Sequence, residues 1–197
     1  MTPAVTCRRA QSPHFDLSLD MRKLSRGLTL YELLITLFLV AILAGIGIPS
    51  FAKVSANARI RTELNALFHA IHLARKESIM RRSVVSICPS DDGLGCQPGL
   101  DWSQGWIMFS NLDRDEPPRI DPGEAVLQVY QSGAKVRISA NRRGFTLRAT
   151  EKRATNGTIV VCDWNNRVTP RALVVSYTGR PRVALKTRSG EAYSCPD

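Results

Sequence analysis

The hydrophobic pattern begins with one uninterrupted apolar segment. From Leu33 to Ala52, 20 successive residues carry no charge and are rich in Leu, Ile, Val and Ala. A helix rises about 1.5 Å per residue, so this segment spans about 30 Å, which is the thickness of the hydrocarbon core of a bilayer. We therefore expect a helix that crosses a membrane.

The helical pattern continues after this segment but becomes amphipathic. Apolar side chains recur every three to five residues, at Leu64, Leu67, Phe68, Ile71, Ala74 and Ile79. Polar side chains occupy the other face, at Arg61, Glu63, Asn65, His69, Lys76 and Arg82. This pattern predicts that the helix continues past Pro49 and packs its apolar face on a globular domain.

Beyond Arg82 the chain changes to short β-rich runs separated by clusters of Gly, Pro and Asp. These runs predict strands at 83–88, 105–110, 125–131, 135–140, 144–149, 158–163, 171–177 and 182–186. One long helix followed by strands predicts an α+β fold, with the helix packed on an antiparallel β-sheet. Residues 89–104 and 111–123 are expected to form exposed loops.

The positive charge is concentrated in the last third of the chain. The whole sequence has 27 Lys and Arg against 17 Asp and Glu, a net charge of +10. Residues 133–197 hold thirteen basic and four acidic side chains, whereas residues 28–132 hold nine and eleven. This distribution suggests a polyanionic partner for the C-terminal region.

The cysteines indicate an oxidising compartment for most of the chain. Cys7 lies far upstream, and Cys88, Cys96, Cys162 and Cys195 lie beyond the apolar segment. Three pairings of these four are possible, and the short spacing of Cys88 and Cys96 favours a local loop, which leaves Cys162 with Cys195. The alternative is four reduced thiols or a zinc site, although no Cys-x-x-Cys pair is present.

A recognisable motif stands directly before the apolar segment. The residues from Lys23 to Glu32 read KLSRGLTLYE, and they resemble the type IV prepilin motif. The resemblance implies that a prepilin peptidase/N-methyltransferase cuts after Gly27 and methylates Leu28, although the family usually has Phe at that position. It also implies that Glu32 serves filament assembly by pairing with the Leu28 amine of a neighbouring subunit, which would neutralise both charges in an apolar core. The alternative is a glutamate that lies in the headgroup layer.

This resemblance sets the expected organisation and location of the chain. Residues 1–27 would be a removed leader, 28–52 a transmembrane and filament-core helix, 53–82 its amphipathic continuation, and 83–197 a β-rich globular domain with a basic tail. Five basic residues precede the apolar segment and three soon follow it, so the N-terminus is expected in the cytoplasm. The protein would then cross the inner membrane once, with a periplasmic C-terminal domain, before it enters a pilus or pseudopilus.

The domain resembles one branch of this family, the FimT and GspH minor pilins and pseudopilins. The resemblance rests on four short segments, Cys88-Pro89, Asp101-Trp102, Gly105-Trp106-Ile107 and Gly179-Arg180-Pro181-Arg182. The last segment is similar to the GRxR motif by which FimT proteins bind DNA during natural transformation. It implies that Arg180 and Arg182 each bind a phosphate, joined by Lys186, Arg188 and Arg171. Four further arginines widen this surface if the strands bring them together: Arg142, Arg143, Arg148 and Arg167.

Two functions from different classes follow from this branch. The first is a FimT-like minor pilin, in or at the tip of a pilus, that binds extracellular DNA without sequence specificity. The alternative is a GspH-like minor pseudopilin, a structural part of a type II secretion pseudopilus whose partners are other pseudopilins. A structural pilus-priming role, with the basic face merely solvated, shares the same anchor. The sequence shows no pattern of catalytic residues, and we expect neither an enzyme nor a cofactor.

Two weaker candidates concern metal ions. His69 and His72 lie one helical turn apart, but no nearby carboxylate or cysteine completes a site, so a surface or packing role is expected. Asn111, Asp113, Asp115, Glu116 and Asp121 form an acidic loop whose spacing misses the EF-hand pattern, so a solvated loop is expected. The three tryptophans, Trp102, Trp106 and Trp164, are expected to pack in the core or at the domain edge.

Overall fold

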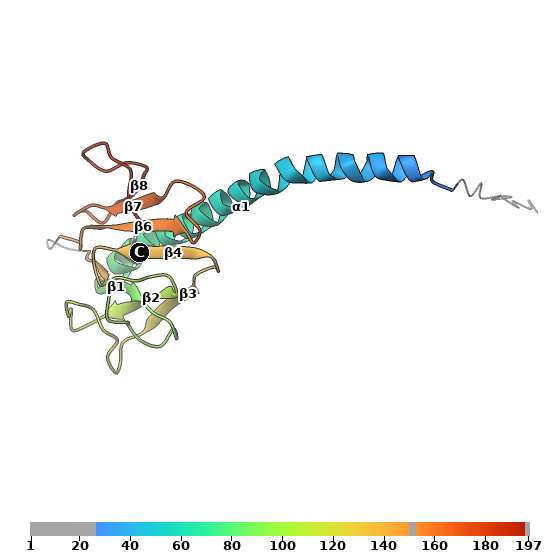
Figure 1. Cartoon of the computed structure of the whole chain (residues 1–197). Coiled ribbons are helices and arrows are strands. Elements are labelled where there is room, and N and C mark those ends of the chain that lie inside the picture. Colours follow the sequence, from blue (N-terminus) through green and yellow to red (C-terminus); the bar gives the residue numbers. More distant parts are fainter. Residues whose placement is uncertain (1–26, 150–152, 196–197) are drawn as a thin grey trace, which may run out of the picture. The chain divides into compact units, whose positions relative to one another are not determined.

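The computed structural model describes residues 27–149 and 153–195. Most of the predicted leader, and Cys7 with it, lies outside the described residues. The chain divides into two compact units, Met1–Leu43 and Ala44–Asp197. Among the described residues there is one helix, α1, from Leu30 to Arg81 with Pro49 inside it, followed by eight strands (Figure 1).

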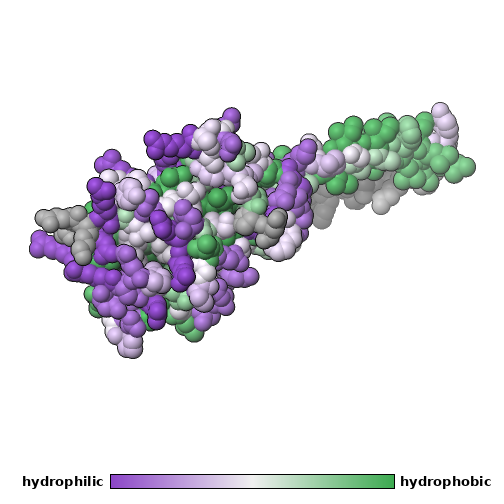
Figure 2. Space-filling model, turned by 60° about the vertical axis from the view of Figure 1, so that its left-hand side comes forward, coloured by the Kyte–Doolittle hydropathy of each residue, from purple (hydrophilic) through white to green (hydrophobic). Residues whose placement is uncertain are grey.

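In the first unit, α1 begins with a local cap. Thr29 precedes the helix, and its Oγ1 accepts a hydrogen bond of 3.2 Å from the backbone N–H of Glu32. A hydroxyl at this position satisfies one of the free N–H groups of the first turn, and an acidic residue in that turn complements the helix dipole. The apolar side chains that follow are exposed, as the green surface in Figure 2 shows. By length and composition this helix can cross a membrane.

At its other end α1 stops at a left-handed residue. Arg82 has a φ of +50°, and the N–H of Ser83 donates to the carbonyl of Ser78 over 3.2 Å. This arrangement satisfies carbonyls of the last turn and turns the chain into the first strand.

The second unit contains two four-stranded antiparallel sheets. One has the order β3-β2-β1-β5 and the other β4-β6-β7-β8. The strands are β1 Val84–Pro89, β2 Gly105–Asn111, β3 Val126–Gln131, β4 Val136–Ala140, β5 Phe145–Leu147, β6 Gly157–Asp163, β7 Arg171–Val175 and β8 Pro181–Ala184. The predicted α+β class is therefore confirmed, with two sheets where the sequence suggested one.

The core lies between α1 and both sheets. It contains Leu64, Leu67 and Ile71 from the helix together with buried residues from strands of each sheet, as well as Trp102 and Trp106. The predicted burial is wrong for two residues of the helix. Ile79 of the apolar face is 53% exposed. Glu63 of the polar face is buried, because its Oε1 accepts a hydrogen bond of 2.7 Å from the N–H of Gly133.

Some strand ends also differ from prediction. The expected strand 171–177 ends at Val175, and the expected strand 182–186 starts one residue earlier, at Pro181. Arg182 lies within β8, as in the predicted strand, opposite Val174 of β7, and Arg180 lies in the turn.

Two disulfide bonds close loops in the second unit. Cys88 at the end of β1 is bonded to Cys96, and Cys162 in β6 is bonded to Cys195 near the end of the chain. The second bond spans 33 residues and fastens the C-terminal tail to the middle of a sheet. Closing a loop of this length restricts the unfolded chain and stabilises the fold by about 3–4 kcal/mol.

A buried ion pair joins α1 to the end of β6. Asp163, whose side chain is 1% exposed, accepts hydrogen bonds from Arg167 Nε at 2.9 Å and Nη2 at 3.0 Å. Arg59 of α1 approaches the same carboxylate at 3.5 Å. The Arg167 guanidinium lowers the pKa of Asp163 from 3.8 to about 2 against the opposing effect of burial.

This ion pair predicts an acid-dependent loss of stability. Since the pKa of Asp163 is lower in the folded state, its contribution is complete well above pH 3.8 and disappears as the pH falls through about 2. The difference corresponds to about 2 kcal/mol. Denaturant unfolding of the full chain in detergent micelles, followed by fluorescence of the buried Trp102 and Trp106, measures it. Between pH 5 and 2 the unfolding free energy of the native chain should fall by about 2 kcal/mol more than that of Asp163→Asn. Equal pH slopes would contradict the assignment.

Candidate functional site

The turn between β7 and β8 carries the first of the two motif arginines. After the last strand pair, Val175 with Pro181, the N–H of Ser176 donates to the carbonyl of Arg180 at 3.1 Å. The N–H of Gly179 donates to the carbonyl of Ser176 at 2.9 Å, and the N–H of Arg180 to Ser176 Oγ at 3.2 Å. The backbone of the turn is thus closed on itself.

Glycine is favoured at position 179 for two reasons. Its φ is +68°, a conformation that side chains with a Cβ rarely adopt, and a Cβ placed there would lie 2.8 Å from Leu147 Cδ1 of β5. The sequence motif therefore uses glycine for both backbone conformation and close packing of the turn on the neighbouring sheet.

A residue that the sequence did not single out fixes the turn to the helix. Arg75 of α1 donates from Nη1 to the carbonyl of Thr178 over 2.6 Å. The two residues are 103 positions apart in sequence, so no local pattern could have paired them. This hydrogen bond anchors the turn at its tip.

The predicted basic residues differ in how they are placed. Arg180, Arg182, Lys186 and Arg188 are all exposed. Within the described part of the chain, no ion pair or hydrogen bond of their side chains is seen. Lys186 and Arg188 belong to a small hairpin of the tail, where the N–H of Thr187 donates to the carbonyl of Glu191 at 2.8 Å. These four side chains are free to bind an anion.

Arg171 is not brought to the same side as Arg182. It pairs with Val161 of β6, whose side chain is buried in the core. Arg182 instead pairs with Val174 of β7, which lies three residues from Arg171 along the same strand. Successive side chains of a strand point to opposite faces, so these two arginines leave the sheet on opposite faces. Of the four arginines expected to widen the surface, Arg148 is paired with Glu116 and Arg167 with Asp163, whereas Arg142 and Arg143 are exposed.

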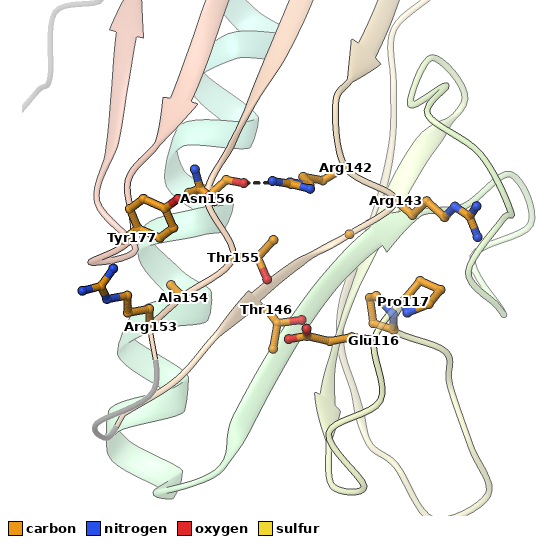
Figure 3. A pocket seen from close by; sticks show the side chains of 12 residues that line it. Glu116, Pro117, Arg142, Arg143, Thr146, Arg153, Ala154, Thr155, Asn156 and Tyr177 are labelled. Carbon is orange, nitrogen blue, oxygen red and sulfur yellow. Dashed lines mark hydrogen bonds between the residues drawn. The ribbon is translucent and has the colours of Figure 1, made fainter.

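A cavity of about 520 Å³ opens beside this turn (Figure 3). Arg142, Arg143 and Arg153 line it, together with Tyr177 from the β7–β8 turn. The guanidinium carbon of Arg153 lies 5.5 Å from the centre of the Tyr177 ring. The sequence reasoning missed Arg153 and Tyr177, because the cavity is assembled from four separate connections of the chain.

The remaining candidates are placed as follows. Gly27 and Leu28 are exposed ahead of α1, and Glu32 is exposed in its first turn. His69 and His72 are exposed and lie against the ring of Phe68.

In the acidic loop, Asp113, Asp115 and Asp121 bring carboxylate oxygens within 4.8 Å of one another. Burial raises the pKa of Asp115, and the negative charge of Asp113 raises it further. Asn111 Nδ2 donates to Asp115 Oδ1 at 3.1 Å and also to Ser86 Oγ at 2.9 Å, whereas Glu116 is bound to Arg148.

Comparisons with known proteins agree with this architecture. The family model described as "Type II transport protein GspH" matches residues 63–179. Two crystal structures of the type IV minor pilin FimU from Pseudomonas aeruginosa PAO1 are similar. One has a TM-score of 0.51 at 20% identity and covers 71% of this chain and 97% of that chain. The other has a TM-score of 0.45 at 21% identity and covers 64% and 90%.

No curated protein matches the sequence. At these identities the first FimU structure supports the fold alone, while the family match covers more than half of the 197 residues. The long apolar helix followed by antiparallel sheets fits both findings. The chain therefore belongs to the GspH family of type IV pilin-like minor pilins and pseudopilins.

Proposed function

We propose that this protein is a FimT-like minor pilin that binds extracellular DNA without sequence specificity, at or near the tip of a pilus, for uptake in natural transformation. The observation that carries the proposal is the β7–β8 hairpin, in which Arg180 and Arg182 are exposed. Its backbone is held by hydrogen bonds within the turn, by the packing of Gly179 on Leu147 and by the hydrogen bond from Arg75. The family match ends at Gly179, so the argument for the two arginines rests on their geometry and charge.

The charge around the hairpin supports an anionic ligand. Between Arg171 and Cys195 there are five basic side chains and one acidic side chain, Glu191. A guanidinium matches the geometry of a phosphate and can donate two parallel hydrogen bonds to it. Because Arg75 and Gly179 already hold the turn, little backbone ordering accompanies binding.

The same geometry favours contacts with the DNA backbone. Arg180 extends from a tight turn and Arg182 from a four-residue strand, and neither lies on a helix that could enter a major groove. Contacts of this kind position the protein but do not read sequence. Four cations, Arg180, Arg182, Lys186 and Arg188, predict that the logarithm of the affinity for duplex DNA falls with the logarithm of the salt concentration, with a slope of about −3 to −4.

The N-terminal residues complete the proposal. Cleavage after Gly27 by a prepilin peptidase/N-methyltransferase would expose the Leu28 amine, and Glu32 would pair with that amine on a neighbouring subunit. The exposed apolar surface of α1 from Leu30 onward supports this assembly, because it needs either lipid or the helices of other pilins to cover it.

The family description favours a second candidate, a minor pseudopilin of a type II secretion system. In that role the partners are other pseudopilins, and the exposed arginines of the β7–β8 hairpin have no required ligand. DNA binding therefore separates the two candidates.

The first test removes the two motif arginines. Fluorescence anisotropy of a labelled 20-base-pair duplex, with the full chain in detergent micelles, should show affinity about tenfold or more lower for Arg180→Gln/Arg182→Gln. The salt slope should become shallower by about 2. A matched variant, Arg61→Gln/Lys76→Gln, removes the same charge from exposed positions of α1 and should bind almost as the native chain does. Equal losses in both variants would show that only net charge matters and would refute a site at the hairpin.

A second test concerns the turn that presents Arg180. Gly179→Ala should lower the unfolding free energy by about 1–2 kcal/mol and weaken duplex binding, since the alanine meets both an unfavourable φ and Leu147. Gly190→Ala is the control, because Gly190 has a φ of +89° but no atom within 4 Å of the added Cβ. Chemical denaturation should show the larger loss at position 179. A loss at 190 as large as that at 179 would mean that packing on Leu147 plays no part.

A further inference from the structure

The cavity beside the β7–β8 turn has the composition of a site for an anionic, aromatic ligand. Three arginines line it, Arg142, Arg143 and Arg153, against one carboxylate, Glu116. Glu116 is itself bound to Arg148, so its charge does not neutralise the lining arginines. The volume of the cavity, about 520 Å³, is within the range of small-ligand sites and accommodates one nucleotide.

Arg142 is held in place at the cavity wall. Its Nε donates to the carbonyl of Asn156 at 3.1 Å, the bond that Figure 3 draws between the two labelled residues. A guanidinium has five N–H donors, so the Nη groups remain available to a ligand. Arg143, the next residue, is exposed and also lines the cavity, but its side chain points the opposite way from that of Arg142 (Figure 3).

Tyr177 provides an aromatic surface at the side of the cavity that adjoins the turn. Its side chain is 54% exposed. The backbone N–H of Ala154 donates to the carbonyl of Tyr177 at 2.9 Å, which fastens this residue to the segment that carries Arg153. An exposed aromatic ring next to arginines is the arrangement with which proteins hold single-stranded nucleic acid, since every base can stack on a ring.

The cavity adjoins the hairpin of the proposed function. Tyr177 lies three residues before Arg180 in the same turn, and a Cβ at Gly179 would lie 3.4 Å from the Cβ of Ala154. A strand whose backbone contacts Arg180 and Arg182 can therefore continue directly to Tyr177 and the arginines of the cavity.

We propose that this cavity binds a nucleotide of single-stranded DNA, with its phosphate on Arg142 and its base stacked on Tyr177. The inference deepens the proposed function and rests on it, because the hairpin arginines hold the adjoining backbone. In a duplex the bases are paired and stacked on one another and cannot reach Tyr177. The protein should therefore bind a single strand more tightly than a duplex of equal length at the same salt concentration.

Anisotropy with a labelled 12-nucleotide oligothymidylate and a 12-base-pair duplex tests this inference on the full chain in detergent micelles. Tyr177→Leu should weaken single-strand binding about fivefold or more and duplex binding less than twofold. Tyr177→Phe, which keeps the ring, should retain single-strand binding. Arg142→Gln should weaken single-strand binding more than duplex binding, while Arg61→Gln removes the same charge from an exposed position of α1 and serves as the control.

An oligonucleotide with abasic sites gives a second readout that does not depend on any substitution. It keeps the phosphates and lacks the bases, so the native chain should bind it only as well as Tyr177→Leu binds oligothymidylate. Competition by thymidine monophosphate, but not by inorganic phosphate at the same concentration, is expected and would show that the base contributes. Equal competition by the two, or equal binding of abasic and normal strands, would overturn the proposal.

The outcomes distinguish the two proposals. If Arg180→Gln/Arg182→Gln loses duplex binding while Tyr177→Leu and Arg142→Gln bind the single strand normally, the cavity proposal fails and the hairpin proposal stands. If the native chain binds neither probe, both fail. If only the cavity variants lose the single strand, the cavity is the DNA site and the hairpin arginines are not.

Discussion

The burial of one face of α1 against two separate sheets is the constraint on which the domain depends. The two sheets share no strand, and their buried side chains meet those of the helix in one core. Leu64, Leu67 and Ile71 thus hold the sheets in a common arrangement. The same helix carries Arg75 to the β7–β8 turn and Arg59 to Asp163. The positions of Arg180 and Arg182 thus depend on the packing of a helix to which neither of them belongs.

Much of this fold could be predicted from the sequence, since each element has a strong local pattern. The uncharged segment from Leu33 to Ala52 and the spacing of Leu64, Leu67 and Ile71 predicted a single long helix, and every predicted strand has a counterpart. The errors have non-local causes. Glu63 is polar but buried, because the N–H of Gly133, 70 residues away, binds it. The division into two sheets depends on which strands pair, and short β-rich runs do not encode their partners.

In the candidate site, too, the sequence predicted what depends on local residues and missed what depends on contacts between distant segments. The Gly-Arg-Pro-Arg segment was visible in the sequence because glycine, proline and arginine have distinct local roles. The face on which each basic residue lies was not visible, and strand register separates Arg171 from Arg182. Arg75, Arg153 and Tyr177 gave no signal, since their importance comes from contacts between distant segments.

The attachment of the basic tail at both ends has a mechanical consequence. β8 is hydrogen-bonded to β7 at one end of the tail, and Cys195 is covalently bonded to Cys162 at the other. A force on Lys186 or Arg188 is shared between these two attachments. The tail cannot be peeled away from a free end one hydrogen bond at a time. Tension is transmitted instead to β6 and β7, the two middle strands of the sheet, and from there to the core formed with α1.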